Sequence, residues 1–183
     1  PSRVALVVDS SGSMQGDKLP SAQRSLLAYL AQTGPRDVLG LIDFDSTVRE
    51  PVVLRGGRAD EAKAMSFVSG LIAEGGTSLY DAVEAGRNWL RRTRRPGEIL
   101  AVVVLTDGND STSKLSLEAL EADLRRSGFA SDDRIGVFTI GYGSSGDYDA
   151  DALRRIAESN GGVFVEGTPD SILKRMEELQ LSF

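Results

Sequence analysis

Two runs of consecutive apolar residues, at positions 4–8 and 99–105, constrain the fold of this chain more than any other feature. A strand with one face in water alternates apolar with polar side chains, so an uninterrupted run indicates a strand that is buried on both faces. Strands of this kind occur in parallel sheets that are covered by helices on both sides. The chain is therefore expected to fold around a central, mostly parallel sheet.

Segments with helical spacing of apolar residues alternate with these runs, which is typical of an α/β fold. The turn at Asp45-Ser46 is too short for a parallel crossover, so the strands on either side of it should be antiparallel. In such doubly wound folds, ligands bind beyond the carboxyl ends of the strands. The pattern predicts strands at 4–8, 38–44, 47–54, 99–105, 135–140 and 163–165, and helices from about 18, at 64–71, 79–90, 117–124, 153–157 and 172–179.

Composition limits the chemistry that this chain can perform. Its 183 residues include no cysteine and no histidine, which excludes disulfide scaffolds, zinc fingers, thiol enzymes and imidazole catalysis. A bound metal must then be held by oxygen, which favours Mg²⁺, Ca²⁺ or Mn²⁺. With 21 basic and 27 acidic residues the net charge is −6, which argues against nucleic-acid binding.

The length suits one domain, residues 1–183, and the chain reaches a strand almost at once after Pro1. We therefore expect a domain excised from a larger protein. No apolar run approaches the ~18 residues of a membrane span, so direct membrane insertion by this domain is not expected.

The loop that follows the first strand contains Asp9, Ser11 and Ser13 in the spacing D-x-S-x-S. In a loop that crosses the end of a strand, alternate side chains can converge, and one carboxylate with two hydroxyls would offer three hard oxygens to a small cation. The alternative is an ordinary loop whose serines cap the following helix.

Asp107 and Thr77 could complete such a site. Asp107 follows the strand at 99–105 and should lie at the same edge of the sheet as Asp9, although Asp-Gly is also a common turn dipeptide. Thr77 precedes a helix in which Ser78 and Asp81 fit a capping box. If Ser78 caps that helix, Thr77 remains free to point elsewhere.

Helix N-termini favour anions, so the helices that follow Ser13 and Ser78 would oppose a cation at this place. Asp9 and Asp107 roughly balance one divalent ion and leave no surplus negative charge. If Asp107 acts through water, the ion stays electron-poor and open to an external ligand. The residues therefore lead to the hypothesis that a bound metal captures a carboxylate.

The combined motifs resemble the von Willebrand factor A (integrin I-like) domain family, whose metal-ion-dependent adhesion site has a D-x-S-x-S loop, a later Thr and a later Asp. The match covers nearly the whole chain and leaves the motif intact, with Thr77 in GGTSLYDA and Asp107 in LTDGND. DSSGSM and GTPDSILKRMEEL are most similar to bacterial members that are secreted or membrane-tethered, which implies an extracellular or periplasmic location. The metal site that the resemblance implies consists of Asp9, Ser11, Ser13, Thr77 and Asp107.

The resemblance also implies a Rossmann-like, doubly wound sheet of six strands in the order 3-2-1-4-5-6, with strand 3 antiparallel and helices on both faces. It implies a protein-binding module and no enzyme, in which Mg²⁺, with Mn²⁺ or Ca²⁺ as alternatives, captures a Glu or Asp of a protein partner. Oligomeric state cannot be read from the sequence.

Two enzymatic interpretations are alternatives to the protein-binding module. The run from Gly141 to Gly146 matches the dinucleotide fingerprint G-x-G-x-x-G, but it lies outside the first βα unit and the next helix is expected to start only near Asp149. Asp9 could also be a phosphoryl-transfer nucleophile, but the second aspartate of that pattern is replaced by Ser11. A nucleotide-binding or Mg²⁺-dependent phosphoryl-transfer enzyme is thus the alternative function.

Three further features are explained by ordinary structural roles. The arginines at 91, 92, 94 and 95 suit the C-terminal end of a helix dipole. The aspartates at 147, 149 and 151 resemble the start of a calcium loop, but helix capping explains them better. Trp89 lies off the main apolar stripe of its helix, so we expect it to be half-buried.

Overall fold

The structure is a computed structural model that describes residues 1–183 except 129–133, 144–147, 168–173, 175–177 and 179–183. It contains a six-stranded sheet in the order β3-β2-β1-β4-β5-β6, which confirms the order that the family resemblance implied. The strands are β1 Ser2–Asp9, β2 Val38–Phe44, β3 Val52–Arg55, β4 Ile99–Thr106, β5 Ile135–Tyr142 and β6 Phe164–Gly167. The described helices are α1 Lys18–Ala31, α2 Glu61–Ser69, α3 Leu79–Thr93, α4 Leu117–Gly128 and α5 Ala150–Glu158, with a 3-10 turn at Gly12–Met14.

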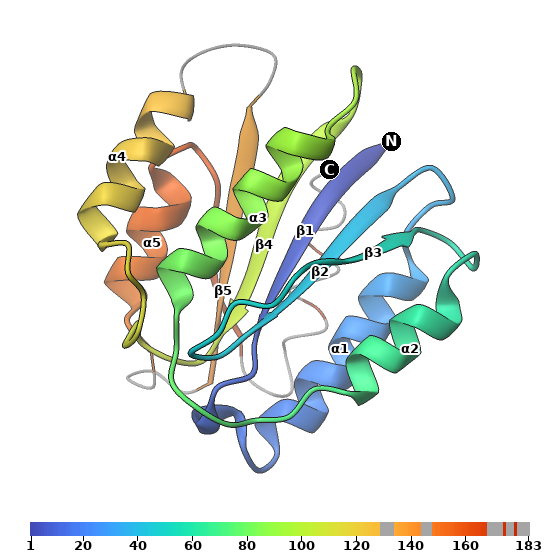
Figure 1. The fold of residues 1–183 in the computed structure, drawn as a ribbon, viewed down its shortest axis with the longest axis horizontal. Helices are drawn as coiled ribbons and strands as arrows, with labels where there is room; N and C mark the ends of the chain where they lie inside the picture. Colours follow the sequence, from blue (N-terminus) through green and yellow to red (C-terminus); the bar gives the residue numbers. More distant parts are fainter. Residues whose placement is uncertain (129–133, 144–147, 168–173, 175–177, 179–183) are drawn as a thin grey trace.

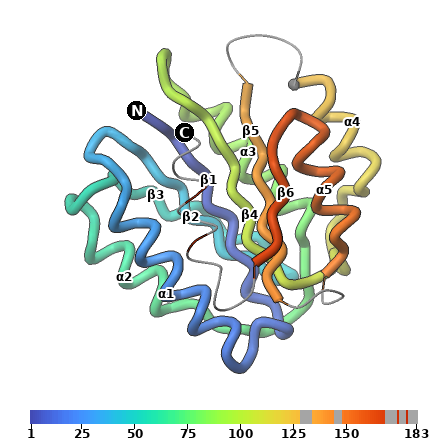
Figure 2. The backbone as a smooth tube through the Cα atoms, turned by 180° about the vertical axis from the view of Figure 1, so that it is seen from behind, coloured from blue at the N-terminus to red at the C-terminus, as the bar shows by residue number. Residues whose placement is uncertain are grey.

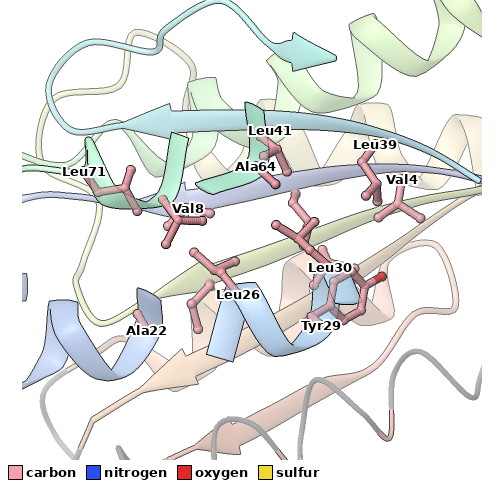
Figure 3. Close-up of a cluster of buried hydrophobic side chains, with 14 of the residues drawn as sticks. Val4, Val8, Ala22, Leu26, Tyr29, Leu30, Leu39, Leu41, Ala64 and Leu71 are labelled. Carbon is pink, nitrogen blue, oxygen red and sulfur yellow. The ribbon is translucent and has the colours of Figure 1, made fainter. Parts of the chain in front are cut away.

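Side chains of β1 alternate between two buried clusters, which explains its uninterrupted apolar run. Val4, Leu6 and Val8 join one cluster with α1 and α2, whereas Ala5 and Val7 join the other with α3, α4 and α5. Figure 3 shows the first cluster between α1 and the strands. The sheet is thus covered by helices on both faces (Figure 1), and this Rossmann-like arrangement confirms the predicted fold class.

The strands on either side of β1 place the edge where its loop emerges. β1 runs parallel to both β2 and β4, with Asp9 opposite Phe44 and Val8 opposite Leu105. Seen from behind in Figure 2, β5 and β6 continue the sheet beside α5. The parallel strands therefore deliver the loops after β1 and β4 to one edge, which lies at the bottom of Figure 1.

The predicted third strand is shorter than expected. β3 is antiparallel to β2 as predicted, but it spans Val52–Arg55, and the expected start at position 47 is wrong. Val48 makes only an isolated bridge with Phe44. Pro51 has no backbone N–H to give to a ladder, which accounts for the late start.

Trp89 corrects a second expectation, since it is buried with 3% of its surface exposed. The indole lies against the backbone of β2, where a Cβ on Gly40 would come within 2.8 Å of three ring atoms. The Arg3 guanidinium covers the ring at 5.9 Å from its centroid. Helical spacing alone missed this position because a glycine on the neighbouring strand makes room for the ring.

Other predictions can be checked only in part. α5 begins at Ala150, in agreement with the start expected near Asp149, and Asp149 caps it by accepting a hydrogen bond from the Ala152 N–H at 3.1 Å. Asp147 and most of the closing helix expected at 172–179 lie outside the described residues. No helix in the described ranges is long and apolar enough to cross a membrane.

Candidate metal site

The Asp9 carboxylate ends β1 in a fully buried position. Its Oδ1 accepts the Ser11 N–H at 2.8 Å and its Oδ2 accepts the Thr106 hydroxyl at 2.6 Å. Burial raises the pKa of Asp9, the hydrogen bonds from Ser11 and Thr106 act against that rise, and the charge of Asp107 adds to it. Within the described chain, the bonds to this carboxylate come from neutral donors, so a cation would relieve the cost of its burial.

Three further predicted residues form a chain of contacts with one another. The hydroxyls of Ser11 and Ser13 lie 3.0 Å apart, and the Ser13 hydroxyl donates to Asp107 Oδ1 at 2.7 Å. The side chain of Asp107 is fully buried, and its Oδ2 accepts from the Lys18 ammonium at 2.9 Å. The D-x-S-x-S loop and the β4 loop therefore meet through their side chains, as the sequence predicted.

Thr77 enters the same place from a third segment. Its backbone is fixed by the loop after β4: its N–H donates to Ser111 Oγ at 3.0 Å, and its carbonyl accepts the N–H groups of Ser111 and Thr112. A Cβ placed on Gly108 would lie 3.5 Å from Thr77 Oγ1, 3.6 Å from Ser13 Oγ and 3.7 Å from Asp9 Oδ2. Oxygens from three separate segments thus lie around one point beside Gly108, which has no side chain to occupy it.

The donor set fits a hard cation. All the donors that surround this point are carboxylate or hydroxyl oxygens, the ligand types that Mg²⁺ prefers. In the described part of the chain, no group of three or more acidic side chains is arranged to hold a metal. A metal at this edge therefore depends on the serine and threonine hydroxyls as well as on the two carboxylates.

The N-terminus of α3 is capped differently from the predicted capping box. The Ser78 hydroxyl makes no cap; it donates to the Ser46 carbonyl at 3.1 Å and lies 2.7 Å from Thr112 Oγ1. The N–H groups of Tyr80 and Asp81 bond instead to Asp110 Oδ1 at 3.2 Å and Ser113 Oγ at 3.0 Å. The capping box was wrong because the caps come from a loop thirty residues away.

This capping changes the electrostatics of the site. Asp110 places a carboxylate on the positive end of α3, which offsets the helix dipole that would oppose a cation. Asp81 accepts the N–H groups of Lys114 and Leu115, which ties the loop after β4 back to the same helix. One of the two opposing helix ends is therefore already occupied by an anion.

A second group of charged residues supports the loops without joining the site. The Arg49 guanidinium lies 2.9 Å from Asp45 Oδ2 and 3.3 Å from Asp43 Oδ2. Asp43 also accepts a short hydrogen bond from the Ser10 hydroxyl, next to Asp9.

A backbone contact joins the loop after β1 to the segment before α3. The Gly75 carbonyl accepts the Gly12 N–H at 3.0 Å, with Gly75 itself at a φ of +78° that favours glycine.

Sequence reasoning missed two residues that contact the predicted site, Lys18 and Thr106. Thr106 could have been found, since it is the last residue of β4, the strand next to β1, and lies beside Asp9. Lys18 gives no such signal, because its reach to Asp107 depends on where α1 begins. Sequence alone therefore found the five proposed ligands but missed the cation and the additional hydroxyl beside them.

The rival dinucleotide site finds no support in the described residues. A Cβ on Gly141 would meet the Tyr148 ring at 2.5 Å, so this glycine accommodates core packing. The fingerprint positions 144–146 lie outside the described residues. α5 begins only at Ala150, after the third glycine of the pattern and not through it.

The fold and its gathered oxygens define an α/β domain with a carboxylate- and hydroxyl-lined edge. A model of the von Willebrand factor type A domain family matches residues 4–178, and the chain belongs to that family. Inter-alpha-trypsin inhibitor heavy chain H4 from Homo sapiens is 30% identical over 170 residues, covering 89% of this chain and 18% of that protein. The Bos taurus H4 chain is 28% identical over the same length and shares. This chain thus spans less than a fifth of these relatives.

Solved structures share the fold. The von Willebrand factor type A protein from Catenulispora acidiphila has a TM-score of 0.80 and 20% identity, covering 97% of this chain and 41% of that chain. Proximal thread matrix protein 1 of the mussel byssus, with a zinc-occupied MIDAS motif, has a TM-score of 0.74 and 21% identity, covering 99% and 45%. Domains of this family typically mediate protein interaction and adhesion.

Proposed function

We propose that this domain binds one divalent metal ion through Asp9, Ser11, Ser13, Thr77 and Asp107 and uses it to capture an acidic residue of a protein partner. The observation that carries the proposal is the convergence of five oxygen-bearing side chains from three loops, two of them buried carboxylates. Mg²⁺ fits this set because it needs few protein ligands and keeps several waters.

The capture step follows from the charge of the site. Asp9 and Asp107 supply two negative charges against the two positive charges of the ion, so the bound metal keeps no surplus of negative ligands. An exchangeable water on the ion is then the natural place for a carboxylate oxygen from a partner. The zinc-occupied motif of the mussel protein supports divalent binding by the fold, and the choice of Mg²⁺ here rests on the oxygen-only donor set.

We propose that residues 1–183 form one non-enzymatic domain of a longer bacterial protein that is exposed outside the cell or in the periplasm. Support comes from the pilus adhesin of Lactobacillus rhamnosus GG, which has the same fold. Its TM-score is 0.77 and its identity is 16%, with coverage of 100% of this chain and 30% of that chain. Lack of imidazole and thiol groups supports a binding role.

Calorimetric titration with Mg²⁺ and Mn²⁺ tests the metal site. The wild-type protein should bind one ion, Asp9→Ala should bind none, and Asp151→Ala, which removes an exposed acid from α5, should bind like the wild type. Equal binding by the wild type and Asp9→Ala would overturn the assignment.

Acetate serves as a minimal carboxylate probe of the capture step. Mn²⁺ relaxes the methyl protons of any acetate that reaches its coordination shell. The loaded wild-type protein and the loaded Asp151→Ala control should therefore both relax acetate more than they relax trimethylammonium, a cation of similar size. Bound Mn²⁺ with no effect on acetate would refute carboxylate capture while leaving the metal site standing.

A further inference from the structure

Lys18 forms an ion pair with Asp107, one of the two proposed metal-binding carboxylates. It is the first residue of α1, and its Nζ lies 2.9 Å from Asp107 Oδ2. The side chain of Asp107 is fully buried, whereas that of Lys18 is 28% exposed. An ammonium at the rim of the site thus neutralises a carboxylate that has no contact with water.

The backbone of Lys18 is held firmly in this position. The Tyr142 hydroxyl, from the end of β5, donates to the Lys18 carbonyl at 2.9 Å, and the Tyr142 side chain is buried. The four-carbon stem of lysine can swing while its backbone stays fixed. The ammonium can therefore leave Asp107 without any movement of α1.

We propose that Lys18 is a built-in counter-ion that competes with the divalent metal for Asp107 and sets the metal affinity of the site. This inference rests on the proposed metal-binding function. A divalent ion bound near Asp107 draws on the same carboxylate and repels the ammonium beside it. Part of the binding energy of the metal is therefore spent on weakening or displacing this ion pair.

The net charge of the site also predicts that Lys18 weakens metal binding. Asp9, Asp107 and Lys18 together carry a net charge of −1, whereas without Lys18 the site would carry −2. A buried site that gains one negative charge binds a divalent cation more tightly. With Lys18 present, the loaded site carries +1, which favours an anionic ligand on the metal.

Lys18→Met tests this role, because methionine keeps an unbranched side chain of similar length and removes the charge. Lys63→Met is the matched control: it lowers the net charge equally but lies on α2. By calorimetry, Lys18→Met should bind Mg²⁺ about tenfold more tightly than the wild type, which equals about 1.4 kcal/mol, and Lys63→Met should match the wild type.

A stability measurement gives an independent readout. In chelator, Lys18→Met should unfold at a lower temperature than the wild type, because Asp107 then lacks a counter-ion, and Mg²⁺ should raise its midpoint by more than it raises the wild-type midpoint. Lys18→Gln, which is neutral and shorter, should bind Mg²⁺ more tightly as well, so the test survives if the methionine variant folds poorly.

The possible failures are distinguishable. Equal affinity in the wild type and both Lys18 variants, or weaker binding in the variants, would overturn the role of Lys18 and leave the metal site standing. Absence of Mg²⁺ and Mn²⁺ binding in the wild type, the control and both variants would overturn the metal function and this inference together.

Discussion

Replacing Asp9 with asparagine should separate the stability of the fold from the binding of metal. Asparagine keeps the shape of the side chain and one carbonyl oxygen, which can accept the Ser11 N–H that Asp9 accepts at 2.8 Å. Its amide N–H can donate to the Thr106 hydroxyl, which rotates to suit. The substitution therefore removes a buried negative charge and keeps a hydrogen bond to both neighbours, with the Thr106 hydroxyl changing from donor to acceptor.

The substitution should raise stability when metal is absent and lower it, relative to the wild type, when metal is bound. Without metal, Asp9→Asn should raise the free energy of unfolding by about 1 kcal/mol, because it removes a buried charge whose hydrogen-bond donors are neutral. With Mg²⁺ at a hundred times its dissociation constant, the wild type gains about 2.7 kcal/mol and the variant gains nothing. At about 2–4 °C per kcal/mol for a chain of this size, the wild-type midpoint should rise by roughly 5–10 °C.

The pH dependence follows from the same carboxylate. Because burial raises the pKa of Asp9, the folded protein holds this proton more tightly than the unfolded chain does. Stability from the protonated form is complete below the unfolded value of 3.8 and is lost as the pH rises through the folded value. In chelator, the advantage of Asp9→Asn over the wild type should therefore grow as the pH rises from below 3.8 toward neutrality.

Thermal unfolding followed by far-UV circular dichroism, in chelator and in Mg²⁺, checks these statements. The wild type and the variant should exchange order: the variant is more stable in chelator and the wild type is more stable in Mg²⁺. A variant that is less stable in chelator, or that gains as much from Mg²⁺ as the wild type, would show that Asp9 is a structural residue and no metal ligand.

Three further changes test the packing and the electrostatics. Glu98→Gln breaks the buried pair with Arg3 at 2.7 Å and should cost about 3 kcal/mol at neutral pH; since the hydrogen bond from Arg3 lowers the pKa of Glu98, this difference should shrink as the pH falls below 4.5 in urea titrations. Gly108→Ala should leave thermal stability unchanged, because its methyl meets only ordinary contacts, yet weaken Mg²⁺ binding about tenfold in calorimetry by filling the space between the donors. Gly40→Ala should cost about 1–3 kcal/mol and shift the fluorescence of Trp89, because the new methyl would overlap the ring.

The strands of the sheet could be predicted because strand formation depends on local patterns, whereas the order of the strands was implied by the resemblance to the family. Runs such as residues 4–8 identify strands that are buried on both faces, and a parallel sheet then delivers its loops to one edge. Asp9 and Asp107 follow neighbouring strands, so their proximity follows from strand order. The D-x-S-x-S spacing is local as well, and the structure joins Ser11 and Ser13 as that spacing predicts.

Two of the features that sequence reasoning missed, the capping of α3 and the burial of Trp89, depend on distant partners. Ser78 reads as a helix cap, but Asp110 and Ser113 supply the caps from another loop. Trp89 reads as half-buried because the space that it fills is created by Gly40 on a neighbouring strand. Such contacts leave no periodic trace in the sequence, so only the folded structure reveals them.

Diffraction from crystals soaked in Mn²⁺ tests the central claim most directly, because the anomalous signal locates the metal itself. The account predicts one strong peak at the edge of the sheet, with the hydroxyls of Ser11 and Ser13 as direct ligands and Asp9, Thr77 and Asp107 bound directly or through water. A peak elsewhere on the surface, or no peak in this place at saturating Mn²⁺, would contradict it.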